Sequence, residues 1–307
     1  MSKNEKIYEV ITKKVIEQLE AAIKSGEKFH WIKGWNSGCV PTGNFISYLG
    51  EDFVPYRGIN QLLLDGLYLT YNQLLDFQKK HPDKDFRIKN GCKKETVYFY
   101  KINEITVKNE ETGEDEIKTI PLLRFYSVFS YKDVEGLEEF VTIPEYEHSL
   151  TENMHKADKI IEDYCTRDNL KFEVVEKSDR CFYRPSKHMV NVPAPKQFKS
   201  INEYYSSVFH ELVHSTSKTL GREVGTGFGS KKYSFEELVA ELGSQMLCNV
   251  LGIADADTEK NNVAYLQNWL KHLKENDPST IVKAATQAQK ACDLILNVKA
   301  NQAENAA

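Results

Sequence analysis

The residues with the strongest chemical signal form the motif H-E-L-V-H at positions 210–214. Apolar residues recur around the motif at helical spacing and predict a helix over residues 201–217. Side chains four residues apart share one face of a helix, so His210 and His214 can reach one tetrahedral ion. Glu211 then lies beside that ion, where it can take a proton from a metal-bound water. A five-residue match also arises by chance, so the motif needs support from elsewhere in the chain.

Two glutamates further along the chain supply that support. Glu237 and Glu241 are four residues apart in a segment, 234–251, whose pattern predicts a second helix. A site of the His₂Glu type takes a carboxylate from a second helix, and another acid can orient a ligand imidazole through its second nitrogen. We therefore expect Glu237 as the third ligand and Glu241 behind a ligand histidine. Two alternatives remain: Ser234 and Glu237 also fit a capping box, and Glu241 also fits an exposed helical acid.

Zinc is the metal that a His₂Glu set favours, but Mn, Co or Ni could occupy the site because availability decides much of metal selection. The sequence leaves open whether the site is catalytic. Between the two helices, residues 220–233 include a G-x-G-x-G stretch. No strand precedes it and no G-K-[ST] follows, so we interpret it as a flap beside the metal rather than a phosphate loop. Weaker candidates near the site are Tyr205 and Tyr233 as transition-state donors and residues 189–193 as an edge strand.

The elements that must position these residues fall into two groups, as a length of 307 residues leads one to expect. The first group has a helix over 5–25, short helices near 58–66 and 70–80, and long strands over 95–108 and 117–131. A polar turn joins the two strands, which predicts a β-hairpin. After a linker over 133–150, the second group has helices over 152–169, 201–217, 234–251, 259–275 and 279–298, and short strands over 171–176, 180–184 and 188–192. The predicted fold class is α+β, with an N-terminal α+β domain over residues 1–140 that contains a long hairpin, and a mainly helical C-terminal domain with a small sheet over 150–307.

The charge of the chain is divided unevenly. A formal net charge of −5 is too small for a DNA mimic, and it is not the basic balance of a non-specific duplex binder. Residues 1–135 contain 20 basic and 20 acidic side chains, but five of these acids lie in the hairpin turn. This part also contains 19 of the 34 aromatic residues. Positive charge interleaved with aromatic rings is typical of surfaces that bind single-stranded nucleic acid, although such rings also form the cores of small domains.

Targeting signals are lacking in the sequence. No run approaches 18 apolar residues, and the N-terminus has no apolar core followed by a cleavage site. Six cysteines are scattered without a C-x-x-C pair, which predicts free thiols in a reducing cytosol rather than a cysteine-based zinc site or disulfide framework. We therefore expect a cytoplasmic protein with no membrane partner.

The motifs of both parts resemble those of ArdC-type antirestriction proteins, whose N-terminal DNA-binding domain also occurs in plasmid primases of the TraC kind. In the first part the resemblance is carried by Trp31, Trp35, Y-R-G-I-N at 56–60, L-T-Y-N-Q at 69–73, and Lys89 with Gly91. In the second part it is carried by F-K-S at 198–200, H-E-L-V-H-S-T at 210–216 and Y-S-F-E-E-L-V-A-E-L-G at 233–243. These segments occur in the family's order and span most of the chain. The sequence departs from the pattern at Ser215, where a tryptophan is common, and in a longer insert before Tyr56.

The resemblance implies a single-stranded DNA-binding domain joined to a zincin-like, gluzincin-type metallopeptidase domain. Such proteins are carried by conjugative or other mobile elements and protect incoming DNA from host restriction. The family's ligand pattern places the metal on His210, His214 and Glu237, with Glu211 as general base. The implied DNA-binding residues are Trp31, Trp35, Tyr56, Arg57, Asn60, Lys89, Lys93 and Lys94, with the aromatic side chains stacking on bases and the cationic ones contacting phosphates.

The expected partners are single-stranded DNA, with duplex DNA and host restriction-enzyme subunits as further candidates. Two other functions are compatible with the same residues. One is a zinc-dependent endopeptidase whose N-terminal domain recognises protein, with water activated by Glu211 attacking a peptide carbonyl. The other is a single-strand-coating accessory to plasmid priming.

Overall fold

A computed structural model describes residues 3–25, 42–50, 53, 55–108, 114–142, 150–223, 231–253, 267, 270–271 and 273–298. By its contacts the chain divides into two compact units. The sheet unit comprises Pro41–Asn60, Leu64–Thr142 and Glu304–Ala307, and the helical unit comprises Met1–Val40, Gln61–Leu63 and Ile143–Ala303. The fold is α+β, as the sequence predicts. Among the described helices, none has an apolar stretch long enough to cross a bilayer.

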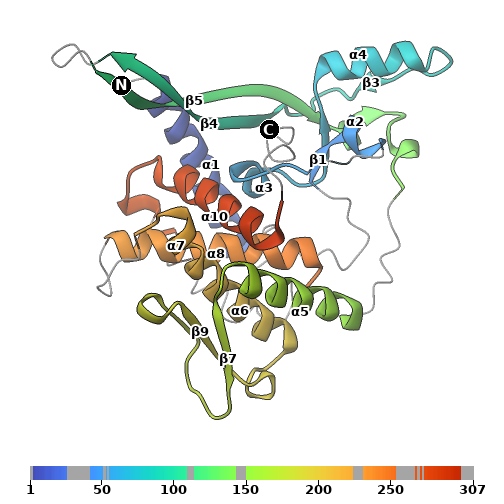
Figure 1. The fold of residues 1–307 in the computed structure, drawn as a ribbon. Coiled ribbons are helices and arrows are strands. Elements are labelled where there is room, and N and C mark those ends of the chain that lie inside the picture. The colour runs from blue at the N-terminus through green and yellow to red at the C-terminus, as the bar shows by residue number, and fades with distance from the viewer. Residues whose placement is uncertain are drawn as a thin grey trace. The chain divides into compact units, whose positions relative to one another are not determined.

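A four-stranded sheet with the order β1-β2-β5-β4 forms the frame of the sheet unit. Its strands are β1 (Gly43–Asn44), β2 (Leu67–Leu69), β4 (Glu95–Lys108) and β5 (Asp115–Ser130). β4 and β5 form the predicted hairpin, which Figure 1 shows as one long two-stranded ribbon. A second, two-stranded sheet pairs β3 (Arg87–Ile88) with β6 (Val134–Glu135). The helices α2 (Phe45–Tyr48) and α4 (Tyr71–Lys80) belong to this unit, whereas α3 (Ile59–Leu63) begins in it and ends in the helical unit.

Aromatic rings fill the core of the sheet unit. The Phe77 ring lies 5.7 Å from Phe45, 5.3 Å from Phe86 and 5.1 Å from Phe140, between centroids. α4 presents Phe77 to this cluster and begins at a capping box, in which the Thr70 hydroxyl accepts from the Gln73 backbone and the Gln73 side chain accepts from the Thr70 N–H. Many of the aromatic residues that enrich this part of the sequence are therefore core residues.

The predicted linker begins too early. Val134 and Leu137 are fully buried, and β6 pairs with β3, so the chain up to Thr142 belongs to the core of the sheet unit. The acidic residues around Val134 and Leu137 are typical of a solvent-exposed linker, which is why the sequence pattern predicts one there. The rest of the predicted linker, residues 143–149, lies outside the described residues.

The helical unit combines a small sheet with several long helices. Its sheet has the order β7-β9-β8, with β7 (Lys171–Val175) parallel and β8 (Phe182–Arg184) antiparallel to β9 (Met189–Pro193). The edge-strand interpretation of residues 189–193 is therefore wrong: β9 is central, β8 is an edge, and the proline is the last residue of its strand. The helices are α1 (Lys3–Ser25), α5 (Leu150–Arg167), α6 (Ile201–Ser215), α7 (Ser217–Leu220), α8 (Lys231–Leu251) and α10 (Thr280–Leu296).

The N-terminal helix α1 packs within the helical unit. Its apolar stripe is buried, with Ile11, Val15 and Leu19 fully covered. The Thr12 hydroxyl donates to the Pro278 carbonyl at 2.6 Å, just before α10. The expected domain over residues 1–140 groups this helix with the hairpin, whereas the contacts group it with the C-terminal helices.

Candidate metal centre

Helix α6 holds the H-E-L-V-H motif, and its start is fixed by Ser200, whose hydroxyl accepts from the Glu203 backbone N–H at 3.1 Å. The apolar face of α6 packs against α8 and the small sheet, with Phe209 and Leu212 fully buried. The two motif histidines are four residues apart and their ring centroids lie 4.7 Å from each other.

Three donors converge on one point between α6 and α8. The Nε2 atoms of His210 and His214 are 3.0 Å apart, and each lies 3.5 Å from an oxygen of Glu237, Oε2 for His210 and Oε1 for His214. Donors around a tetrahedral zinc ion, at bond lengths of about 2.0–2.1 Å, are about 3.3 Å from one another. The three observed separations lie on both sides of that value, so these side chains fit one ion and leave a fourth position open. In the described part of the chain, no other group of three histidine, cysteine or acidic side chains brings its ligand atoms within 4.8 Å of one another.

The competing interpretation of Glu237 as a capping-box residue is wrong. α8 begins at Lys231, so Ser234 lies inside the helix rather than at its N-cap. Nothing then requires the Glu237 carboxylate to return to the backbone, and it faces the two imidazoles instead.

Each motif histidine has a carboxylate on its other nitrogen. Glu241 Oε1 lies 3.5 Å from His210 Nδ1, and Glu236 Oε1 lies 3.3 Å from His214 Nδ1. Such partners fix the tautomer and ring orientation of a ligand histidine. Glu241 is expected from the sequence, whereas Glu236 was missed. Its signal was available, because Glu236 shares a helix face with the fully buried Val239 and Ala240, where an acid needs a partner.

The carboxylates shift the ionisation of the cluster. Burial alone would lower the pKa of His210, but Glu237 and Glu241 outweigh it and hold this pKa well above its ordinary value. For the acid Glu236 the effects are reversed. Burial alone would raise its pKa, but hydrogen bonds with His214 and Arg222 lower it. The raised pKa of His210 thus reports the negative charge of Glu237 and Glu241 beside it, which favours a bound cation.

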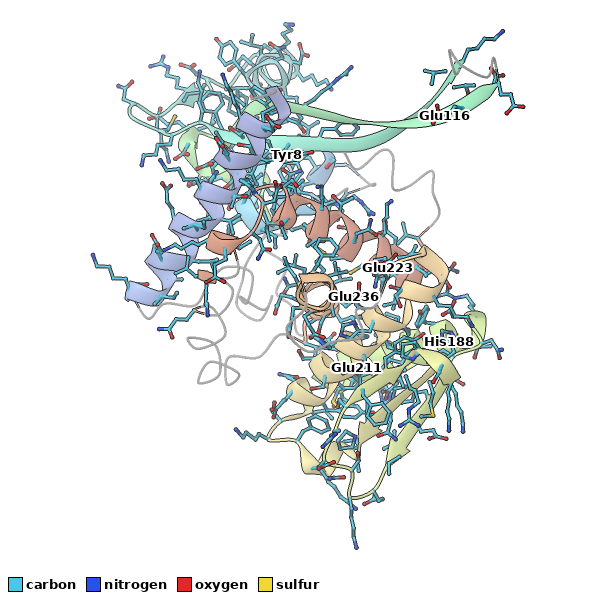
Figure 2. The ribbon with its side chains drawn as sticks, turned by 90° about the vertical axis from the view of Figure 1, so that its left-hand side faces the viewer. Tyr8, Glu116, His188, Glu211, Glu223 and Glu236 are labelled. Atoms are coloured by element: carbon cyan, nitrogen blue, oxygen red, sulfur yellow. The ribbon has the colours of Figure 1, made fainter. Side chains whose placement is uncertain are left out.

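Glu211, labelled in Figure 2, follows His210 directly in the sequence of α6. It is 8% exposed, and burial raises its pKa, an effect that His210 and His214 partly oppose. The backbone of Tyr183, in the edge strand β8, also opposes this rise in the pKa of Glu211. A carboxylate with a raised pKa is suited to accept a proton from water and pass it on.

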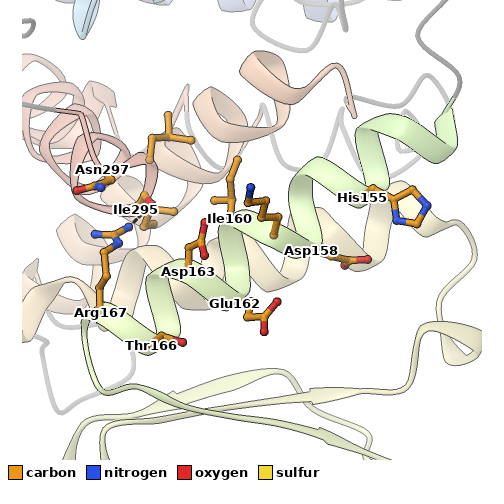
Figure 3. A pocket seen from close by; sticks show the side chains of 11 residues that line it. His155, Asp158, Ile160, Glu162, Asp163, Thr166, Arg167, Ile295 and Asn297 are labelled. Carbon is orange, nitrogen blue, oxygen red and sulfur yellow. Dashed lines mark hydrogen bonds between the residues drawn. The ribbon is translucent and has the colours of Figure 1, made fainter.

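The two tyrosine candidates do not join this cluster. Tyr205 is 2% exposed, and its hydroxyl donates to Asp158 on α5 at 2.8 Å, so it supports the fold. The Tyr233 side chain lies outside the described residues. Asp158 lines a groove of about 680 Å³ along α5, beside the C-terminal end of α10, whose lining mixes acidic and basic side chains (Figure 3). No predicted site residue lines this groove.

The predicted DNA-binding residues are placed differently. Trp31 and Trp35 lie outside the described residues. Tyr56 and Asn60 are buried, at 5% and 7% exposure, so their assignment to a DNA-binding surface is corrected: both side chains serve the fold. Asn60 donates to the Tyr98 carbonyl at 2.7 Å and accepts from its N–H at 2.8 Å, which satisfies a backbone position of the edge strand β4.

The cationic candidates remain on the surface of the sheet unit. Lys89, Lys93 and Lys94 are exposed, and Arg57 is partly exposed. The Lys94 ammonium lies 5.7 Å from the centroid of the buried Phe129 ring, and Lys89 donates to a backbone carbonyl at 2.6 Å. These contacts leave the lysine side chains at the surface.

Two exposed aromatic residues of β5 were missed. Phe125 is 53% exposed and Tyr126 is 38% exposed, and Arg124 beside them is exposed as well. The sequence signal was their adjacency, because successive residues of a strand point to opposite faces and both rings cannot enter one core. Phe125 lies opposite Tyr98 in β4, with 6.5 Å between ring centroids.

Comparisons with known proteins agree with both parts of the fold. Residues 5–129 match the family described as the N-terminal domain of anti-restriction factor ArdC, and residues 159–287 match zincin-like metallopeptidases. The metal-free crystal structure of antirestriction ArdC protein from the R388 plasmid is similar over 97% of this chain and 98% of that one, with a TM-score of 0.60 and 29% identity. The chain is therefore similar to ArdC along nearly its whole length. A Mn(II)-bound structure of the same ArdC protein has a TM-score of 0.60 and 28% identity, with 98% of each chain covered.

Similarity to other proteins extends beyond ArdC itself. A DNA primase TraC of Escherichia coli is 30% identical over 316 residues, which cover 96% of this chain and 27% of that protein. The chain thus spans about a quarter of the length of this primase. The uncharacterized protein y4eC of Sinorhizobium fredii (strain NBRC 101917 / NGR234) is 26% identical, covering 94% of this chain and 90% of that protein.

Proposed function

We propose that this chain is a cytoplasmic antirestriction protein of a mobile or conjugative element, which binds single-stranded DNA and carries a metal site of metallopeptidase type. The convergence of His210, His214 and Glu237 carries the metal part of the proposal. DNA binding is assigned to residues 1–140 and the metal to residues 150–307. The match to the N-terminal domain of anti-restriction factor ArdC and the similarity to a DNA primase support DNA as the partner.

His210, His214 and Glu237 would hold the ion, and Glu236 and Glu241 would orient the two imidazoles. Zinc suits this donor set, and a Mn(II)-bound structure of the related ArdC protein supports a divalent ion more broadly. When bound there, a divalent ion would supply Lewis-acid chemistry, by which a carbonyl would be polarised and the pKa of water lowered. Glu211, whose pKa is raised by burial, would accept the proton of the attacking water and pass it to the leaving nitrogen.

The proposed DNA-binding residues of the sheet unit include Phe125 and Tyr126, which point to opposite faces of β5 and take the stacking role that the buried Tyr56 cannot perform. These exposed rings and the exposed cations Arg124, Lys93 and Lys94 of the same unit offer the combination that binds single strands: stacking on bases and charge for phosphates. Labelled single-stranded oligonucleotides, titrated over a salt series, test this part. We expect binding that weakens with salt, and affinity independent of salt would refute phosphate contacts.

A specific observation favours a second function, that of a zinc-dependent endopeptidase whose N-terminal domain recognises protein. Glu211 is buried, has a raised pKa and belongs to the same helix as two ligands, as a peptidase general base requires. Cleavage of a restriction subunit or of casein that disappears in Glu211→Gln, with the metal still bound, would establish this activity. Full antirestriction activity in the same variant would show that protection needs no hydrolysis. The role in priming requires a polymerase partner, and co-purification with one would favour it.

A further inference from the structure

Arg222 is a buried arginine in the helical unit, just behind the metal-ligand cluster. Its side chain is 6% exposed, and its guanidinium donates four hydrogen bonds. Two go to Glu236, from Nε to Oε2 at 3.0 Å and from Nη2 to Oε1 at 2.8 Å. The other two go to the C-terminal end of α6, at the Val213 carbonyl and the Thr216 hydroxyl, both at 2.8 Å.

The acid that Arg222 grips is the one that holds a ligand histidine. Glu236 is 2% exposed, and its Oε1 lies 3.3 Å from His214 Nδ1. A buried carboxylate with a single histidine partner could rotate or shift, whereas a bidentate arginine fork fixes the plane of the carboxylate. Because Arg222 also binds the last turn of α6, it fixes Glu236 relative to the helix that carries His214.

The backbone places Arg222 in this position. After α7 the chain turns at Gly221, whose left-handed φ of +65° glycine adopts without strain, and the Arg222 N–H donates to the Ser217 carbonyl at 2.8 Å. The segment that the sequence predicts to be a flap is therefore anchored at its start. Arg222 itself belongs to the support of the metal centre.

We propose that Arg222 is a positioning residue of the metal centre, which acts through Glu236 to hold His214 with its Nε2 turned toward the ion. The inference rests on the proposed metal site. It adds Arg222 to the three ligands and to the carboxylates that orient the two histidines. The Arg222 guanidinium binds Glu236, and Glu236 in turn binds the ligand His214. Without the Arg222 guanidinium, the buried Glu236 carboxylate would lose its bidentate partner. His214 would then lose its fixed orientation.

The test measures zinc affinity of the full chain by competition with a chromophoric chelator. We expect Arg222→Gln and Glu236→Gln each to weaken zinc binding by about 10–100-fold, the usual effect of losing an outer partner of a ligand. The zinc affinity of Arg222→Lys should lie between that of these two variants and that of wild type. Lysine keeps the positive charge but cannot form the bidentate hydrogen bonds of arginine. The double variant Arg222→Gln/Glu236→Gln should bind zinc no more weakly than Glu236→Gln alone, since both residues act through one carboxylate.

Arg167→Gln provides a matched control. Arg167 also donates to helix-terminal carbonyls, those of Leu294 and Ile295, but it contacts no metal ligand (Figure 3). We expect this variant to bind zinc as wild type does. The visible spectrum of the Co²⁺-substituted protein gives a second readout, and it should change in Arg222→Gln and stay unchanged in Arg167→Gln.

The outcomes separate the inference from the proposed function. If the wild-type chain binds no zinc or Co²⁺, the proposed metal site fails and the role of Arg222 fails with it. If wild type binds and a folded Arg222→Gln binds equally well with an unchanged Co²⁺ spectrum, only the inference is overturned. If Arg222→Gln does not fold, Arg222→Lys and the double variant decide by the same comparisons. A double variant that binds much more weakly than Glu236→Gln would contradict action through Glu236.

Discussion

A Cβ atom on Gly243 would lie 2.7 Å from Cγ2 of Val213 and 3.0 Å from its Cγ1. Val213 belongs to the H-E-L-V-H motif on α6 and is fully buried, and Gly243 follows Glu241 by two residues on α8. The glycine thus lets the two helices approach beside the cluster. This approach brings carboxylates of one helix within reach of imidazoles of the other.

Gly243→Ala should push α8 away from α6. We expect the free energy of unfolding to fall by about 1–3 kcal/mol, as for other overpacked cores, and zinc affinity to fall with it. Urea unfolding and chelator competition measure the two effects. Gly50→Ala is the control, because its Cβ would meet nothing closer than 3.5 Å. Equal losses in the two variants would refute the packing argument.

His210→Ala should remove the metal and leave DNA binding intact. His210 supplies one of the three converging donors, whereas the proposed DNA surface lies in the other unit. Elemental analysis of the purified variant gives the metal content, and oligonucleotide titration gives the affinity. Loss of both properties in a folded variant would contradict a division of labour between the two units.

Glu211→Gln should keep the metal and lower any hydrolytic rate by about 10²–10⁴-fold, the usual contribution of a general base. Burial raises the pKa of Glu211, and only the ionised carboxylate can accept a proton, so the wild-type rate should decline as pH falls through this raised value. The measurement is a pH–rate profile on a cleavable substrate, with metal content verified at each pH. A profile that is flat on the acid side would exclude Glu211 as the base.

Phe125→Ala and Tyr126→Ala should each weaken single-strand binding by about 1–3 kcal/mol if bases stack on them. Replacing Lys93 and Lys94 by glutamine should instead reduce the salt slope, by about 0.7 for each phosphate that the variant no longer neutralises. Tyr71→Ala is the control, since Tyr71 is another exposed aromatic residue of this unit, at 53% exposure. Weakening of the same size in the control would point to a general effect of surface aromatics.

Asn60→Ala should act on stability rather than on DNA. The change leaves the N–H and carbonyl of Tyr98 without their side-chain partner, at a cost of about 1–3 kcal/mol for a buried group left unsatisfied. Denaturant unfolding measures this cost. An unchanged stability combined with abolished DNA binding would restore Asn60 to the DNA-binding surface.

The sequence predicts elements well where local pattern decides them. β4 spans the predicted residues 95–108, and α1, α4, α6 and α10 lie within a few residues of their predicted ranges, because apolar periodicity and local signals such as the Thr70 cap decide them. It fails where burial depends on distant segments. Tyr56 and Asn60 carry groups typical of a binding surface, yet strand β4 buries Asn60, and no local signal reveals that strand as its partner.

The candidate site shows the same division. The histidines and Glu237 follow from helical spacing, which a single sequence displays directly. Glu236 and Arg222 depend on how α8 and the turn after α7 return to the end of α6, so their partnership is a property of tertiary structure. Adjacent residues such as Glu236 and Glu237 point about 100° apart on a helix, and only packing decides which one faces the ion.

The position of α1 makes the sheet unit an insertion. The helical unit contains chain segments on both sides of the sheet unit: α1 before it, and the chain from α5 onward after it. The buried apolar stripe of α1, through Ile11 and Val15, holds these two segments of the helical unit together without a covalent bond. A single backbone cut between the sheet unit and α5 would therefore not release a free domain. The two fragments would stay together through α1 and separate only in denaturant, so fragment complementation is an expected property of this chain.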